Sequence, residues 1–493
     1  MTSHATSTPD TSAALPRHRD AYYGGAWHPP IGGAYVAVEN PADRTGLGQV
    51  ADCGGEDVQA AVAAASAGFE IWRDVPPLER ARLLRQIAAV LRAEADRFAM
   101  IDALDCGNPY SATKHDALIA ADTVEFFAGL VTEMKGESVP LGPDAVNFTL
   151  REPLGVVARI YPFNHPLLFC ASKLAAPLAA GNTIVLKPPE QAPLSTLRFV
   201  ELVDGLLPPG VINMVPGGRD VGAALVAHPK IAKIALTGSV ATGRAVMRSG
   251  AEGLKRVSLE LGGKNALIAF PDAHIDRLVD GIIRGMNFHW CSGQSCGSTS
   301  RVFLHDSIHD EVVARVRARC EAIRQGVPTD PQSEMGAIIS KTQFDRIMGF
   351  IDAARTEGAV LVTGGGRPPA PELANGYFIQ PTVFSGVSQS MSIAREEIFG
   401  PVVSVLRWSD EASMLADVNA VDYGLTASIW TRDITNALRT ARRVEAGYVW
   451  INNASMHYLG TPFGGRKQSG IGREECLDEL LSFTDQKSVT VTL

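Results

Sequence analysis

The sequence predicts an α/β protein built from two mainly parallel sheets, and three observations support this fold class. From residue 154 onward, apolar strands rich in β-branched residues alternate with segments of helical length. A second series of the same kind begins at residue 265. The chain, at 493 residues, is also too long for a single hydrophobic core. Continuous apolar strands separated by helices are typical of parallel sheets covered on both faces.

The first series supplies five strands, and the second begins with NALIAF (265–270) and runs to about residue 465. We therefore place a domain boundary near Gly263. The five strands are LGVVARIY (154–161), TIVLKP (183–188), VINMVPG (211–217), KIALTG (233–238) and RVSLELG (256–262).

The segments outside these series predict smaller elements. YYGGAWH and YVAVENP predict short strands between residues 22 and 41, and an amphipathic helix is expected to start near Glu56. A second helix is predicted over residues 79–104, with one apolar stripe formed by Leu84, Ile87, Leu91, Phe98 and Ile101. Residues 135–153 form an extended excursion. The terminal strand KSVTVTL has no local partner, so we expect it to pair with an edge elsewhere, such as one on another subunit.

Composition excludes several classes of protein. Hydrophobic residues make up 46% and charged residues 20% of the chain, as in ordinary globular proteins. A net charge of -8 without a basic patch argues against nucleic-acid binding. The opening MTSHATSTPDTSAALPRHRD is not a secretory signal, and no apolar run approaches the ~20 residues that span a membrane. Seven scattered cysteines without CxxC spacing indicate neither disulfides nor a metal site, and favour a cytoplasmic location.

The stretch CSGQSCGSTSR (291–301) places Cys296 among glycines and serines. Free cysteine usually behaves as a small buried hydrophobe, so a thiol in a polar loop is either reactive or incidental. Polar surroundings beside helix termini would leave Cys296 partly ionised at neutral pH.

Two glycine patterns are candidates for nucleotide binding. GLGQVA (46–51) matches G-x-G-x-x-A, but it neither follows a buried strand nor opens a helix, so we interpret it as a chance match. TGSVATGRA (237–245) follows a strand and opens a helix, with Gly238 and Gly243 five positions apart. Arg244 and Ala245 stand where a nucleoside-triphosphate loop needs Lys and Ser or Thr, which disfavours that class. The N–H groups at Gly238 and Ser239 can cradle a pyrophosphate, although a tight turn without a ligand is the alternative.

Lys187 and Glu190, in VLKPPEQAP, close another strand of the first series. A carboxylate at this position can accept both hydroxyls of an adenosine ribose and repels a 2′-phosphate. This favours NAD over NADP, although Lys-Pro-Pro-Glu alone is also an ordinary turn.

Four stretches together resemble the aldehyde dehydrogenase superfamily: PFNHP (162–166), LELGGKN (259–265), GQSC (293–296) and EEIFGPV (396–402). The resemblance runs from about Trp27 to the C-terminus and includes PFGGRKQSGIGRE (462–474). It implies a Rossmann-like NAD-binding domain (18–134 and 154–263), an α/β catalytic domain (264–468) and a small β oligomerisation arm (135–153 and 475–493). It also implies a homodimer or homotetramer that acts on a small-molecule aldehyde, with no nucleic-acid or membrane partner.

The resemblance further implies the roles of individual residues. Cys296 is the nucleophile, and the amide of Asn164 and the backbone N–H of Cys296 stabilise the oxyanion. Glu260 activates the water that hydrolyses the thioester, with Lys173 and Glu474 in a proton relay. Glu397 and Phe399 are expected to hold the nicotinamide ribose and flank its ring. The full set implied for the cofactor is Ile160, Pro162, Phe163, Lys187, Glu190, Gly238, Ser239, Gly243, Leu261, Gly262, Glu397 and Phe399.

The substrate tunnel departs from the family pattern, because Phe163 stands where a tryptophan is usual. An aromatic lining with three imidazoles and a small Ser172 predicts a wide tunnel for an aromatic or otherwise bulky aldehyde. Aromatic faces could instead hold a quaternary ammonium aldehyde, as in a betaine-aldehyde dehydrogenase. The residues aligned with the tunnel are His165, Phe169, Ser172, His289, Trp290, His457, Tyr458 and Phe463.

Three other functions compete with this one. A CoA-acylating dehydrogenase needs no hydrolytic base, so Glu260 argues against it. A thioester or ester hydrolase without NAD leaves Lys187, Glu190 and the Gly238 loop unexplained. The third is a non-catalytic protein that kept only the fold. Cys291 is interpreted as a packed side chain, with a reversible Cys291–Cys296 disulfide as a minor hypothesis.

Overall fold

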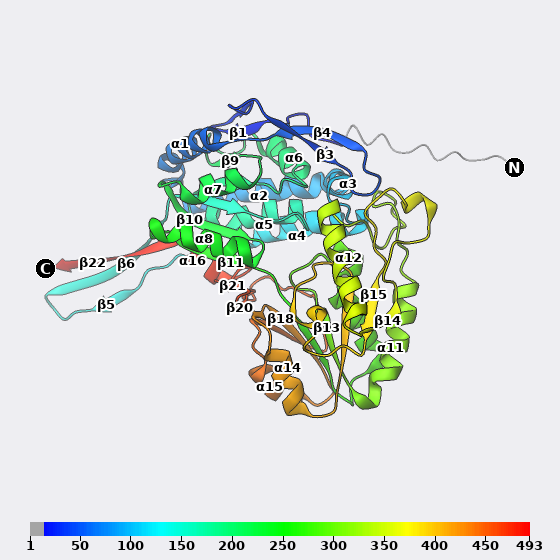
Figure 1. Cartoon of the computed structure of the whole chain (residues 1–493). Coiled ribbons are helices and arrows are strands. Elements are labelled where there is room, and N and C mark those ends of the chain that lie inside the picture. Colours follow the sequence, from blue (N-terminus) through cyan, green and yellow to red (C-terminus); the bar gives the residue numbers. More distant parts are fainter. Residues whose placement is uncertain (1–13) are drawn as a thin grey trace.

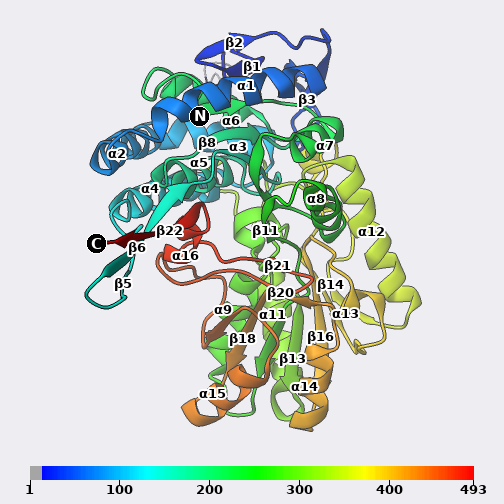
Figure 2. The ribbon, with the colours of Figure 1, turned by 90° about the vertical axis from the view of Figure 1, so that its left-hand side faces the viewer.

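The computed structural model describes residues 14–493, so the first 13 residues of the polar N-terminal segment lie outside it (Figure 1). Two mainly parallel sheets carry helices on both faces, which confirms the predicted fold class. Figure 2 shows the first sheet and its helices in the upper half of the molecule and the second sheet in the lower half. Within residues 14–493, no helix is long and apolar enough to cross a membrane.

The first sheet contains the five strands predicted between residues 154 and 262, all parallel to one another. Antiparallel strands border this parallel core on both sides. In spatial order the strands are β2 (Ala26–His28), β1 (Ala21–Tyr23), β9 (Ile212–Met214), β8 (Thr183–Lys187), β7 (Val156–Ile160), β10 (Ile231–Thr237), β11 (Arg256–Glu260) and β21 (Gly470–Ile471).

Two separate apolar clusters pack on the first sheet. One cluster is built with α2 to α6, and the other with α1, α7 and α8. These helices are α1 (Gly55–Trp72), α2 (Pro77–Ala93), α3 (Ala95–Asp105), α4 (Tyr110–Gly129), α5 (Pro166–Ala179), α6 (Leu194–Val203), α7 (Arg219–Ala227) and α8 (Val240–Glu252).

The single helix predicted over residues 79–104 is wrong, because the structure divides it into α2 and α3 at Glu94. The Glu94 backbone leaves the helical region with φ -102° and ψ 11°, and its carboxylate lies 3.1 Å from Arg97. The predicted stripe is nevertheless fully buried along both helices. Apolar periodicity therefore located the core face correctly. It did not reveal the break at Glu94, because this polar residue lies between the stripe positions Leu91 and Phe98.

The second sheet starts at β12, directly after residues 261–265 carry the chain out of the first sheet. All its pairings are parallel except the edge pair β14–β15. Its strands, in spatial order, are β14 (Val360–Thr363), β15 (Thr382–Ser385), β16 (Val402–Trp408), β13 (Arg301–His305), β12 (Ala266–Ala269), β18 (Thr426–Trp430) and β19 (Tyr448–Ile451). The domain ranges given above stay predictions.

Two further apolar clusters enclose the second sheet between helices. The remaining helices are α9 (Ile275–Gly285), α10 (Phe288–Cys291), α11 (Asp306–Glu321), α12 (Lys341–Thr356), α13 (Ser392–Arg395), α14 (Glu411–Asn419), α15 (Ile434–Arg443) and α16 (Leu477–Leu481). Two small ribbons pair β3 (Tyr35–Glu39) with β4 (Gly46–Ala51), and β17 (Tyr423–Gly424) with β20 (Arg466–Lys467).

A three-stranded arm projects from the first sheet (Figure 1). It consists of β5 (Ser138–Pro140), β6 (Ala145–Pro153) and β22 (Thr484–Thr492), with β6 in the centre. As predicted, the terminal strand has no local partner and pairs with an edge elsewhere, but that edge belongs to its own chain and not to another subunit. β22 pairs antiparallel with all nine residues of β6, so the excursion and the C-terminus complete each other across more than three hundred residues of sequence.

Candidate active site

Two cavities meet between the sheets, and they share one wall. The first cavity has a volume of about 370 Å³ and the second about 570 Å³. The residues common to both are Asn164, Phe169, Thr237, Glu260 and Cys296. The three residues predicted to carry the chemistry therefore come together, although they belong to separate parts of the chain.

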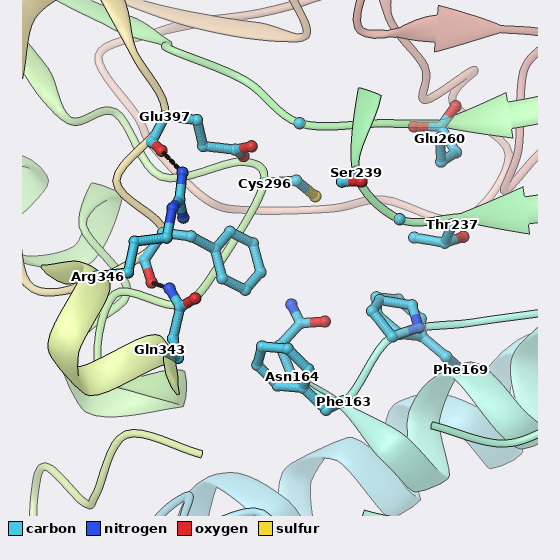
Figure 3. A pocket seen from close by; sticks show the side chains of 14 residues that line it. Phe163, Asn164, Phe169, Thr237, Ser239, Glu260, Cys296, Gln343, Arg346 and Glu397 are labelled. Atoms are coloured by element: carbon cyan, nitrogen blue, oxygen red, sulfur yellow. Dashed lines mark hydrogen bonds between the residues drawn. The ribbon is translucent and has the colours of Figure 1, made fainter. Parts of the chain in front are cut away.

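Cys296 lies in the loop that leads from α10 to β13. This loop turns sharply, because Ser292 and Gly293 adopt left-handed backbone conformations with φ of 53° and 74°. The Asn265 amide fixes the other end by donating to the Cys296 carbonyl at 2.7 Å. Figure 3 shows the sulfur directed into the cavity, with Glu260 on one side and Asn164 opposite.

The expectation that polar surroundings keep the Cys296 thiol partly ionised is wrong for the protein alone. Burial raises the pKa of Cys296 above its ordinary value, and the charges of Glu260 and Glu397 raise it further. Cys291 is fully buried, and both thiols are free. The disulfide between them stays a hypothesis.

Glu260 ends β11, where parallel pairing aligns it with Thr237 of β10. Burial raises the pKa of this carboxyl well above its ordinary range, and Glu474 adds a second upward influence. Neither carboxyl oxygen has a hydrogen-bond partner within residues 14–493. A buried carboxyl with both oxygens free has the properties of a general base that works near neutral pH.

A buried ionic network lies behind Glu260. Lys173, on α5, contacts the Glu474 carboxylate, and Arg159 lies 3.6 Å from Glu474 and 3.4 Å from Glu479. Burial alone would raise the pKa of Glu474, but Lys173 and Arg159 lower it below its ordinary value. Lys173 and Glu474 thus form a charged pair next to the second cavity, and their role as a relay stays a prediction.

Asn164 lies in the turn between β7 and α5, and its amide points toward Cys296 (Figure 3). Asn108 anchors this turn by donating from its side chain to the Asn164 carbonyl at 2.7 Å. In the described chain the Cys296 N–H has no hydrogen-bond acceptor. Two neutral N–H groups are therefore free to face an oxygen bound beside the sulfur.

The Gly238 loop differs in detail from the prediction. The Gly238 N–H already donates to the Glu260 carbonyl at 2.9 Å, and the Ser239 hydroxyl caps α8 by accepting from the Thr242 N–H. A Cβ at Gly243 would lie 2.6 Å from a methyl group of Leu261, so this glycine lets α8 pack against the end of the first sheet. GLGQVA forms strand β4 and opens no helix, as expected of a chance match.

Glu397 and Phe399 enter the first cavity from the loop before β16. The Glu397 carboxylate accepts the Gly263 N–H at 3.0 Å, and burial raises its pKa to about 6. Phe163 and Phe399 meet edge to face with ring centres 5.8 Å apart. A Cβ at Gly262 would lie 2.0 Å from a Glu397 oxygen, so any other residue there would displace the Glu397 carboxylate.

The other predicted cofactor residues lie behind or beside this cavity. Ile160 and Lys187 end the neighbouring strands β7 and β8 and are paired in register. Lys187 is buried and donates to the Pro188 carbonyl at 3.1 Å, whereas Glu190 is exposed and accepts from Gln191 at 2.9 Å. The predicted residues in the cavity wall itself are Pro162, Phe163, Gly238, Ser239, Gly262, Glu397 and Phe399.

The second cavity contains every predicted tunnel residue except His289. His289 lines a neighbouring cavity that shares Trp290 and Met456 with the second one, and its ring lies 3.3 Å from the Glu334 carbonyl, so its place in the tunnel stays a prediction. Alternate residues around the short helix α10 point in different directions, and sequence spacing alone does not resolve them. The predicted residues that do line the second cavity are His165, Phe169, Ser172, Trp290, His457, Tyr458 and Phe463.

Comparisons with known proteins identify the family and the fold of this chain. A sequence model of the aldehyde dehydrogenase family matches residues 27–489. The chain belongs to the aldehyde dehydrogenase family. The predicted resemblance is thereby confirmed, and the protein is an oxidoreductase.

Individual relatives cover nearly the whole chain of this aldehyde dehydrogenase. Aldehyde dehydrogenase tropH of Talaromyces stipitatus is 49% identical over 99% of this chain and 96% of its own. The NAD+ complex of an aldehyde dehydrogenase from Bacillus cereus is 38% identical, with a TM-score of 0.95 over 99% of each chain. A betaine aldehyde dehydrogenase from Staphylococcus aureus in complex with NAD+ is 33% identical, with a TM-score of 0.95 over 98% of this chain and 97% of that one.

Sequence reasoning missed two residues of this aldehyde dehydrogenase that shape the first cavity. Arg346 and Gln343, on α12, donate to the backbone carbonyls of Glu397 and Phe399 at 2.5 Å and 2.7 Å (Figure 3). They hold the loop that presents those two side chains. Both stand in an ordinary amphipathic helix without a motif, so no pattern marked them.

Proposed function

We propose that the protein oxidises an aldehyde to a carboxylic acid with NAD as the acceptor, using Cys296 as the nucleophile. The observation that carries this proposal is the shared wall, where Cys296, Glu260 and Asn164 border both cavities. A substrate in the second cavity and a cofactor in the first would approach the sulfur from different sides. The test is NADH formation from an aldehyde, followed by absorbance.

The first cavity suits a nicotinamide cofactor. Its wall contains the helix start at Ser239 and the rings of Phe163 and Phe399, and the missing Cβ of Gly262 leaves room for the Glu397 carboxylate beside them. Solved structures of two relatives with the same fold are complexes with NAD+. When bound, the cofactor supplies the acceptor for the hydride that leaves the substrate carbon. We assign its pyrophosphate to the start of α8 and its nicotinamide ribose to Glu397.

The chemistry then follows from the side chains of this chain. The Cys296 sulfur bonds to the aldehyde carbon, its proton passes to a base, and the Asn164 amide and the Cys296 N–H stabilise the oxyanion. Loss of hydride from that carbon restores the carbonyl and leaves a thioester on Cys296. Glu260 takes a proton from water, the resulting hydroxide attacks the thioester, and the carbon–sulfur bond breaks to release the acid.

Glu190 is proposed to set the preference for NAD over NADP. Its carboxylate would repel a 2′-phosphate, and a unit-charge interaction at about 4 Å in water is worth ~1 kcal/mol. Glu190→Gln should therefore raise the NADP/NAD ratio of kcat/KM by roughly fivefold, because 1.4 kcal/mol corresponds to a factor of ten. Initial rates with both cofactors measure this ratio. An unchanged ratio would remove Glu190 from the ribose site.

We propose an aromatic or otherwise bulky aldehyde as the substrate. Phe169, Trp290, Tyr458 and Phe463 give the second cavity an aromatic wall, and its volume of about 570 Å³ accommodates a ring. In a steady-state panel, benzaldehydes should show a higher kcat/KM than short aliphatic aldehydes. Highest activity with acetaldehyde contradicts the assignment, and highest activity with betaine aldehyde supports the cation–π alternative. A requirement for CoA would instead indicate the acylating reaction.

A second copy of the chain is the proposed partner of the arm. β6 exposes Val146, Phe148 and Leu150 at alternate positions, so they lie on one face of the arm sheet. The outer edge of β22 is also free within the described chain. An apolar face beside an open strand edge favours pairing between copies, in a homodimer or homotetramer.

A further inference from the structure

Asp116 is a fully buried carboxylate in the middle of α4, and each of its oxygens binds a different side chain. One oxygen lies 2.9 Å from Nδ1 of His165, and the other accepts the Trp290 indole N–H at 2.7 Å. Its side chain is 0% exposed. Removing one partner from a buried charge is costly, so both bonds hold the carboxylate and its partners in place.

The His165 side of this arrangement leads to the oxyanion donor. His165 is the residue that follows Asn164, and it precedes the first turn of α5. Burial alone would lower the pKa of His165, but Asp116 and Cys291 raise it to about 10, which favours a protonated ring that donates from Nδ1 to the Asp116 carboxylate. The neighbouring turn that carries Asn164 is therefore tied to α4 by a charged hydrogen bond.

The Trp290 side leads to the nucleophile. Trp290 lies in α10, directly before the left-handed turn at Ser292 and Gly293 that ends at Cys296. The indole packs edge to face against the His165 ring, with centres 5.1 Å apart. The two loops that supply the reacting groups thus meet over one carboxylate.

We propose that Asp116 is a positioning residue that fixes the Asn164 turn and the Cys296 loop relative to each other through His165 and Trp290. This inference rests on the proposed roles of Cys296 and Asn164. Asp116 itself lies outside the walls of both cavities, so it acts through its two partners. A displacement of about 1 Å between reacting groups can reduce the rate roughly a hundredfold.

The test compares Asp116→Ala, Asp116→Asn and Trp290→Phe at saturating aldehyde and NAD, with rates expressed per active site titrated with a thiol reagent. Asp116→Ala loses both acceptors, so kcat should fall about a hundredfold while the KM for NAD stays unchanged. Asp116→Asn keeps the shape and one good acceptor, and Trp290→Phe removes a single donor. Both should fall between the wild type and Asp116→Ala.

Asp105→Asn is the matched control, because Asp105 is another buried aspartate of the same domain and accepts the Leu194 N–H at 2.7 Å. It should retain the wild-type kcat. A wild-type kcat in Asp116→Ala overturns the inference, and so does an equal loss in all three variants accompanied by a raised KM for NAD. If Asp116→Ala does not fold, the graded losses in the other two variants decide. Full activity of Cys296→Ala would refute the proposed function itself.

Discussion

Replacing Cys296 with alanine should abolish aldehyde oxidation. The sulfur is the atom in the shared wall that can bond to the aldehyde carbon, and Glu260 and Asn164 have no covalent role to substitute for it. Loss of a catalytic nucleophile costs many orders of magnitude, so kcat should fall by at least about a thousandfold. NADH formation over a long incubation measures the residual activity of the variant. Binding of NAD, followed by quenching of protein fluorescence, should persist.

Cys320→Ala is the matched control for this variant. Cys320 is another free thiol, buried in the apolar cluster on the second sheet and remote from both cavities. It should lower thermal stability slightly and leave kcat unchanged. If Cys296→Ala still oxidises aldehydes at the rate of Cys320→Ala, the nucleophile lies elsewhere.

Glu260→Gln should stop the enzyme after its first turnover. The glutamine amide keeps the shape of the side chain but cannot take a proton from water, so the thioester on Cys296 accumulates. Rapid mixing should show a burst of NADH close to one equivalent per active site, followed by a steady rate about a hundred- to ten-thousandfold below that of the wild type. Intact-mass analysis of the quenched protein should detect the acyl group.

The pH dependence of the wild type provides the comparison. Burial raises the pKa of Glu260, so its ionised fraction, and with it the hydrolysis rate, should increase as the pH rises through that pKa. The Glu260→Gln variant should lack this rise. Glu252→Gln, a change at an exposed position at the end of α8, should behave as the wild type. A fast Glu260→Gln enzyme would assign hydrolysis to another base.

Much of the fold follows from local pattern. Strands such as TIVLK and ALIA are continuous apolar runs, and each became a central parallel strand. The resemblance placed residues 135–153 and 475–493 in one arm, but the register of β22 against β6 was not predictable, because it depends on contacts between distant segments. The turn at Glu94 was missed for a related reason, since a continuous apolar stripe does not reveal a change in direction of the helix axis.

The active site, like the fold, has features that the sequence predicted and features that it did not. Cys296, Glu260 and Asn164 were found because each stands in a short, distinctive stretch. The raised pKa of Cys296 was not predicted, because it depends on burial and on the nearby carboxyl groups of Glu260 and Glu397, which come from other elements. Asp116 was missed because it carries no motif at all. The sequence therefore predicts which residues form the site, whereas their burial and contacts depend on the assembled fold.

The crossing between the sheets determines how this enzyme can fail. Glu260 is the last residue of β11 in the first sheet, Cys296 lies on a loop of the second sheet, and the chain leaves the first sheet through Gly262 and Gly263. A Cβ at Gly263 would lie 2.6 Å from the Cys296 carbonyl, so the backbone at this crossing has no room for a side chain. The packing between the two sheets therefore fixes the position of the base Glu260 relative to the nucleophile Cys296. A change that moves the two sheets apart would slow hydrolysis of the thioester relative to hydride transfer, well before either sheet unfolds.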